Sequence, residues 1–78
     1  MRKRDELTDP YSCLGKAEDD EPLFVLRAKD PLSSTTVRAW ADYAAKSGFH
    51  EREKIDEARM CADTMDNWRT SKGYDREA

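Results

Sequence analysis

The chain is poor in the large apolar side chains that build most protein cores. Among its 78 residues, leucine, isoleucine, valine and phenylalanine together number only ten. Their longest run, at positions 23–26, is far shorter than the roughly 18 residues of a membrane-spanning helix. The sequence therefore predicts a small domain with a thin core and no membrane span.

Glycine, cysteine and histidine are also scarce. The three glycines are too scattered to form a phosphate-binding loop. Cys13, Cys61 and the single histidine, His50, lack the spacing of metal ligands, so we expect free thiols and neither a metal nor another cofactor. The basic residues 2–4 are not followed by the apolar stretch of a signal peptide, which favours a cytoplasmic protein.

Charge is abundant, but neither sign dominates. Seventeen acidic and 14 basic residues leave a net charge of −3, and charged residues make up 40% of the chain. Proteins that bind nucleic acid through its phosphates need a surplus of lysine and arginine, so this composition argues against nucleic acid as the partner. A chain of this size also has little room for a substrate pocket, and we do not expect an enzyme.

Residues 31–48 have the spacing of an amphipathic helix. Asp30 is placed to cap its first turn ahead of a proline, with Ser33 or Ser34 as the alternative cap. Gly48 suits the left-handed residue that ends a helix. The apolar positions recur three and four residues apart, at Val37, Trp40, Ala41 and Ala44.

The pattern of residues 51–72 predicts a second helix, which a tight turn joins to the first. Its apolar arc consists of Ile55, Ala58, Cys61, Ala62, Met65 and Trp68. Its charged side offers two pairs at a spacing of four, Arg52 with Asp56 and Arg59 with Asp63. We expect the two helices to form an αα-hairpin in which Trp40 and Trp68 face each other. The predicted core is Val37, Trp40, Ala44, Ile55, Ala58, Met65 and Trp68.

The N-terminal part has less regular patterning. We expect residues 1–9 to be a mobile charged tail and residues 75–78 to be a frayed C-terminus. The remaining residues, 10–74, are expected to form a single small helical domain. Residues 10–17 suit one helical turn or a tight loop, because they are too few for an independent helix. The predicted fold class is mainly α, an αα-hairpin of two amphipathic helices with an N-terminal extended segment or short strand.

That extended segment is residues 22–28, which hold the one continuous apolar run. Its length and its β-favouring side chains are typical of a strand, yet the sequence contains no second strand. A lone strand leaves its backbone groups unpaired. We therefore expect it either to lie over the helices, with Leu23 or Val25 against their core, or to pair with its copy in a homodimer.

Acidic side chains and tyrosines are the candidate binding residues. Rows of acids bind cationic clefts through complementary charge, and tyrosines anchor protein interfaces. The first acidic surface is the run Glu18, Asp19, Asp20 and Glu21. The alternative acidic surface, on the second helix, consists of Glu53, Asp56, Glu57 and Asp63. The aromatic candidates are Tyr43 and Tyr74, and no residue is assigned a catalytic, cofactor or metal role.

Residues 12–70 resemble a group of small proteins encoded by phages and prophages. The likeness is carried by the stretches EPLFVLRAKDPLS and TVRAWAD, at 21–33 and 36–42, and by the charged helix ending near Trp68. Ser12-Cys13-Leu14 and Asp19-Asp20-Glu21 ahead of them also fit the pattern. The resemblance carries over no catalytic or ligand-binding residue.

The resemblance implies a phage protein that acts in the cytoplasm of a bacterial host. Small acidic phage proteins include anti-CRISPR proteins, which are similar to this chain in size and charge. It therefore implies a non-enzymatic protein that binds and inhibits a host defence complex, most specifically by blocking the nucleic-acid-binding face of a Cas effector. The alternative is a small phage regulatory or accessory protein that pairs with itself or binds DNA.

Overall fold

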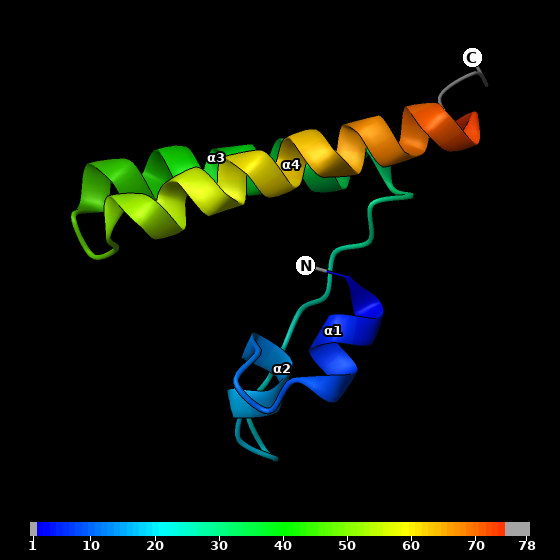
Figure 1. Cartoon of the computed structure of the whole chain (residues 1–78). Coiled ribbons are helices and arrows are strands. Elements are labelled where there is room, and N and C mark those ends of the chain that lie inside the picture. Colours follow the sequence, from blue (N-terminus) through cyan, green and yellow to red (C-terminus); the bar gives the residue numbers. More distant parts are fainter. Residues whose placement is uncertain (1, 75–78) are drawn as a thin grey trace.

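The computed structural model describes residues 2–74, and within them the chain is helical and contains no strand. Four helices follow one another: α1 (Lys3–Thr8), α2 (Cys13–Lys16), α3 (Pro31–Ser47) and α4 (Arg52–Lys72). The helices α3 and α4 lie side by side as an antiparallel hairpin, and α1 and α2 form a smaller unit beside it (Figure 1). The mainly α class and the αα-hairpin predicted from the sequence are confirmed.

The ends of α3 are set by local signals. The carboxylate of Asp30 accepts a hydrogen bond of 2.9 Å from the backbone N–H of Leu32, and Pro31 takes the first helical position. At the other end, Gly48 has a φ of 74° and donates to the carbonyl of Ala44. Asp30 is therefore the cap, whereas the alternative caps at 33 and 34 lie inside the helix.

The seam between α3 and α4 is lined mostly by small side chains. Its buried residues are Ser33, Ser34, Ala41, Ala44, Ile55, Ala62 and Arg69. Alanine and serine let two helix backbones approach closely, but they bury little apolar area. The hairpin therefore has the thin core that the composition predicts.

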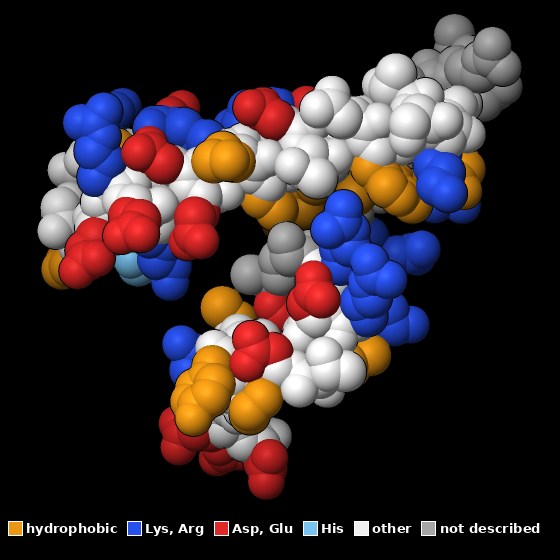
Figure 2. Space-filling view, viewed as in Figure 1, with side chains coloured by type: hydrophobic (Ala, Val, Ile, Leu, Met, Phe, Trp, Pro, Cys, Tyr) orange, Lys and Arg blue, Asp and Glu red, His pale blue; other side chains and the backbone are white. Residues whose placement is uncertain are grey.

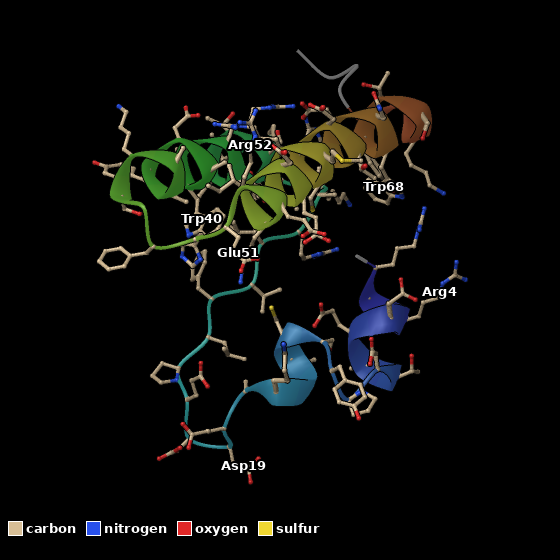
Figure 3. All side chains as sticks on the ribbon, turned by 60° about the vertical axis from the view of Figure 1, so that its left-hand side comes forward. Arg4, Asp19, Trp40, Glu51, Arg52 and Trp68 are labelled. Carbon is tan, nitrogen blue, oxygen red and sulfur yellow. The ribbon has the colours of Figure 1, made fainter. Side chains whose placement is uncertain are left out.

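The prediction that both tryptophans belong to this core is wrong. Trp40 is 39% exposed and packs against His50, with 5.1 Å between ring centres. Trp68 is 40% exposed and packs against Tyr74 at 5.5 Å. Figure 3 shows the two indoles near opposite ends of the hairpin, so they do not face each other. An indole ring needs more room than a seam of alanine and serine leaves.

Of the other positions predicted to be buried in the core, some are buried and others are exposed. Ala44 and Ile55 are buried, and three more positions are half-buried, namely Val37, Ala58 and Met65. Leu23 and Val25 are exposed, so the extended segment does not cover the hairpin core. Residues 21–27 instead run as an extended connection between the two helical units (Figure 1).

The α1–α2 unit is held together by hydrogen bonds. Glu6 accepts from the backbone N–H of Leu14 at 2.9 Å, and the hydroxyl of Ser12 donates to the carbonyl of Glu6 at 3.0 Å. The same hydroxyl accepts from Gly15 N–H and so caps α2. Residues 10–17 thus contain the predicted single helical turn. The charged tail predicted for residues 1–9 contains α1, which the sequence pattern did not indicate.

The predictions for the two ends of the chain fall partly on residues that the structure does not describe. Residue 1 and the frayed C-terminus predicted at 75–78 are outside the described residues. Within residues 2–74, every helix is either too short or too polar to cross a membrane.

Candidate binding surfaces

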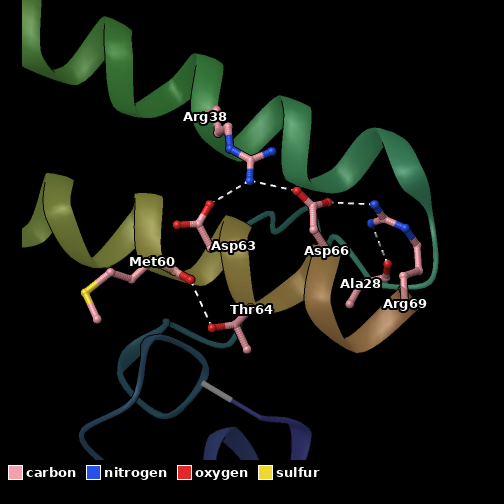
Figure 4. A network of polar contacts seen from close by, with 7 residues as sticks. All are labelled: Ala28, Arg38, Met60, Asp63, Thr64, Asp66 and Arg69. Atoms are coloured by element: carbon pink, nitrogen blue, oxygen red, sulfur yellow. Dashed lines mark hydrogen bonds and ion pairs between the residues drawn. The ribbon is translucent and has the colours of Figure 1, made fainter. Parts of the chain in front are cut away.

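A network of charged side chains joins α3, α4 and the connection (Figure 4). Arg38 donates hydrogen bonds to Asp63 at 2.8 Å and to Asp66 at 2.7 Å. Asp66 also accepts from Arg69 at 2.6 Å. Arg69 in turn donates to the backbone carbonyl of Ala28 at 3.2 Å. The network thus links the end of the connection to both helices of the hairpin.

Asp66 is held in its ionised form by its neighbours. Hydrogen bonds from Ser34, Arg38 and Arg69 hold the pKa of Asp66 well below its usual range. The two carboxylates of Asp63 and Asp66 raise the pKa of Arg38 above its ordinary value. These groups satisfy one another, which makes the network a structural element rather than a proton-transfer site.

The other ion pairs differ in part from the predicted ones. Arg52 lies 3.8 Å from Asp56, as its spacing predicts. Arg59 does not pair with Asp63 but reaches across the hairpin to Asp42 at 3.0 Å. The close approach of the two helices favours pairing between them over pairing along one helix.

The acidic candidates on α4 lie on a face of mixed charge. Arg38 pairs with Asp63, and Arg52 with Asp56, so two of the four carboxylates have a cationic partner. Glu53 and Glu57 are exposed, with Lys54 between them in sequence. Figure 2 shows acidic and basic side chains intermixed along the hairpin. This surface therefore presents little net negative potential.

The acidic loop, residues Glu18–Glu21, is different. Its four residues are exposed, and within residues 2–74 none of its carboxylates forms an ion pair. The loop is a tight turn in which Glu21 N–H donates to Glu18 C=O at 3.1 Å, and the Glu21 carboxylate accepts from Glu18 N–H at 3.0 Å. Asp19 and Asp20 project from the middle of this turn.

The two acidic surfaces are separate. Figure 3 places Asp19 at the tip of the α1–α2 unit, far from Glu51 and Arg52 at the start of α4. In Figure 2 the acidic cluster at this tip borders hydrophobic side chains. The structure therefore does not join the eight acidic candidates into one patch.

The two tyrosine candidates have different surroundings. Tyr43 is exposed on α3. Tyr74 packs on Trp68, and the ammonium group of Lys29 lies 4.8 Å from the centre of its ring. Tyr43 is thus open to a partner, whereas Tyr74 already takes part in contacts that link the connection to the end of α4.

The sequence left two places open for the segment 22–28, over the helices or at a homodimer interface. Leu23 and Val25 are both exposed, together with Phe24, which excludes packing over the hairpin core. An open hollow of about 370 Å³ beside them is lined by residues 24–27 with Lys29, Asp30 and Ser33. The sequence feature that indicates an exposed surface here is the apolar run at 23–26, which has no partner strand.

The remaining reactive groups do not form a cluster. No group of three possible metal ligands occurs within residues 2–74. Cys13 and Cys61 are free thiols. Of the bases near the start of α3, Arg38 pairs with two carboxylates and Lys29 lies over the ring of Tyr74, whereas Arg27 is exposed.

Comparisons with known proteins add no relative. No family model matches the chain, and neither a curated protein nor a solved structure is significantly similar to it.

Proposed function

We propose that the chain is a non-enzymatic phage protein that binds a host defence complex in the bacterial cytoplasm and inhibits it. In its most specific form, the protein is an anti-CRISPR whose acidic loop occupies the nucleic-acid-binding cleft of a Cas effector. The loop presents carboxylates where the effector would otherwise hold phosphates. The protein would thus compete with nucleic acid for the same lysines and arginines.

One observation carries this proposal. Within residues 2–74 no carboxylate of the acidic loop forms an ion pair, whereas Asp56 and Asp63 on α4 do. The loop is exposed at a tip, where it can enter a cleft (Figure 3). The exposed Phe24 and Val25 follow closely in sequence. A charged surface next to exposed apolar side chains suits a protein interface, because charge speeds association while apolar contact slows dissociation.

A competition assay tests the proposal. A purified Cas effector with its guide RNA is mixed with labelled target DNA, and the chain is added at increasing concentration. The chain should displace the DNA, and the double variant Asp19→Lys/Asp20→Lys should raise the required concentration about tenfold or more, because several exposed charges act together. Raising the salt to about 0.5 M, where the screening length is about 4 Å, should also weaken displacement.

The matched control is the double variant Glu53→Lys/Glu57→Lys, which makes the same charge change on α4. It should displace DNA as the wild type does. Displacement that survives the loop reversal and high salt but is lost in Tyr43→Ala would contradict the acidic-loop mechanism and indicate an aromatic interface. Failure to displace DNA from any effector tested, together with no capture of a defence complex from host lysate, would overturn the proposed function.

A further inference from the structure

The connection is drawn out but has no partner strand (Figure 1). Residues 22–26 belong to no helix or strand, and within residues 2–74 their backbone N–H and C=O groups make no hydrogen bond. Leu23, Phe24 and Val25 are 53%, 88% and 76% exposed. An extended apolar segment with unpaired backbone groups is a template for pairing with another strand.

The charges on either side of this segment identify the partner. Glu21, the last of four acids, directly precedes it and Arg27 directly follows it; both are exposed. Two copies that pair antiparallel about a two-fold axis at Phe24 bring Glu21 opposite the partner's Arg27. A parallel pairing would instead place like charges opposite each other, which is unfavourable.

We propose that residues 21–27 pair with the same residues of a second copy as an antiparallel two-stranded ribbon centred on Phe24. Residues directly opposite each other in such a ribbon alternate between hydrogen-bonded and non-hydrogen-bonded pairs. With Phe24 in a non-hydrogen-bonded pair, Leu23 and Val25 exchange backbone hydrogen bonds with the partner's Val25 and Leu23. Pro22, which has no N–H, then falls in a non-hydrogen-bonded pair, where it costs the ribbon nothing.

The same alternation arranges the side chains. Pro22, Phe24 and Leu26 fall on one face of the ribbon, and the two-fold axis doubles them into a continuous apolar face. Glu21 and Arg27 fall on the other face, together with Leu23 and Val25. The pair of Glu21 with the partner's Arg27 is therefore the one to test.

This self-pairing does not depend on the proposed function, although it uses one acid of the same loop. In the ribbon, Glu21 is neutralised by the second copy, whereas Glu18, Asp19 and Asp20 are not. Its test needs only the purified chain, so its failure is distinguishable from a failure to bind a defence complex.

The experiment is sedimentation equilibrium of the full chain from micromolar to millimolar concentration. The wild type should dimerise with rising concentration. Glu21→Arg and Arg27→Glu should each raise the dimer dissociation constant about tenfold or more, because each creates two like-charge pairs across the axis. An equimolar mixture of the two variants should dimerise as well as the wild type, because each chain then faces opposite charges at both positions.

The control is Glu57→Arg, which makes the charge change of Glu21→Arg on α4 and should leave the dimer unchanged. Far-UV circular dichroism should show the same helix content in every variant, since positions 21 and 27 lie outside the helices. A chain that stays monomeric up to millimolar concentration would overturn the proposal. A dimer that neither single variant weakens would also overturn it, because its interface would lie elsewhere.

Discussion

The guanidinium of Arg69 donates a hydrogen bond of 3.2 Å to the backbone carbonyl of Ala28, 41 residues earlier in the chain. The Arg69 side chain is only 8% exposed, and it also binds Asp66. It therefore holds the last turn before α3 against the far end of α4. The position at which the connection meets the hairpin depends on this contact rather than on apolar packing.

Replacing Arg69 should destabilise the hairpin measurably. Arg69→Ala removes charge-assisted hydrogen bonds to Asp66 and to the Ala28 carbonyl, which should lower the free energy of unfolding by about 1.5–3 kcal/mol. Urea unfolding followed by circular dichroism measures the change. Arg52→Ala, whose side chain is 92% exposed, is the control and should change stability by less than about 0.5 kcal/mol. Equal effects of the two substitutions would contradict the role assigned to Arg69.

Asp66 should make stability depend on pH in the acid range. Its pKa is lowered in the folded chain, so between pH 5 and pH 2, a range set by its unfolded pKa of about 3.9, the unfolded state binds more protons. The contribution of Asp66 is therefore complete at neutral pH and is lost as the pH falls through this range. Thermal melts should show a shallower acid dependence for Asp66→Asn than for the wild type. Parallel pH profiles of the two proteins would refute this prediction.

Ile55 is the one large aliphatic side chain buried in the hairpin seam. Ile55→Ala should cost about 2–5 kcal/mol, through lost burial and the cavity left behind. Such a loss is a large part of the stability of so small a domain. Phe49→Ala is the matched control, because Phe49 is 87% exposed and its truncation should cost little. If the Ile55→Ala protein melted with the wild type, the seam described above would not be the core.

Gly15 should be required by the α1–α2 unit. A Cβ at this position would lie 2.7 Å from the carbonyl oxygens of both Asp9 and Pro10, closer than real Cβ contacts. Gly15→Ala should therefore open this unit while leaving the hairpin intact. Hydrogen exchange should show faster exchange in residues 3–17 and unchanged protection in α3 and α4. Uniformly unchanged exchange would show that the close approach at Gly15 is not maintained.

Local signals explain which parts of the fold were predictable. Asp30 before a proline and Gly48 after an apolar pattern act within one turn of the helix. Sequence reasoning therefore placed the C-terminal end of α3 and narrowed its start to Asp30 or to Ser33 or Ser34. The α1 helix has no apolar period, and it is stabilised by the contact from Glu6 to Leu14, which local pattern does not reveal.

Contacts between the two helices were less predictable. The pairs of Arg38 with Asp63 and Arg59 with Asp42 depend on how each helix is rotated about its axis, which periodicity defines only coarsely. These pairs also fix a register in which Trp40 lies near the turn and Trp68 near the far end. The tight turn at Gly48 already implied this register, so the expectation of facing tryptophans could have been rejected from the sequence. The candidate acids were correctly placed on the surface, but their grouping into two separate places required the structure.

The length of the connection sets how the two helical units can act together. Residues 21–27 reach at most about 25 Å when fully extended. A large partner that held the α1–α2 unit would therefore keep the α3–α4 hairpin within that radius of its surface. Tethering over so short a span corresponds to millimolar effective concentration. Two weak contacts, one from each unit, would then combine into avidity well above that of either alone, and lengthening the connection would reduce it.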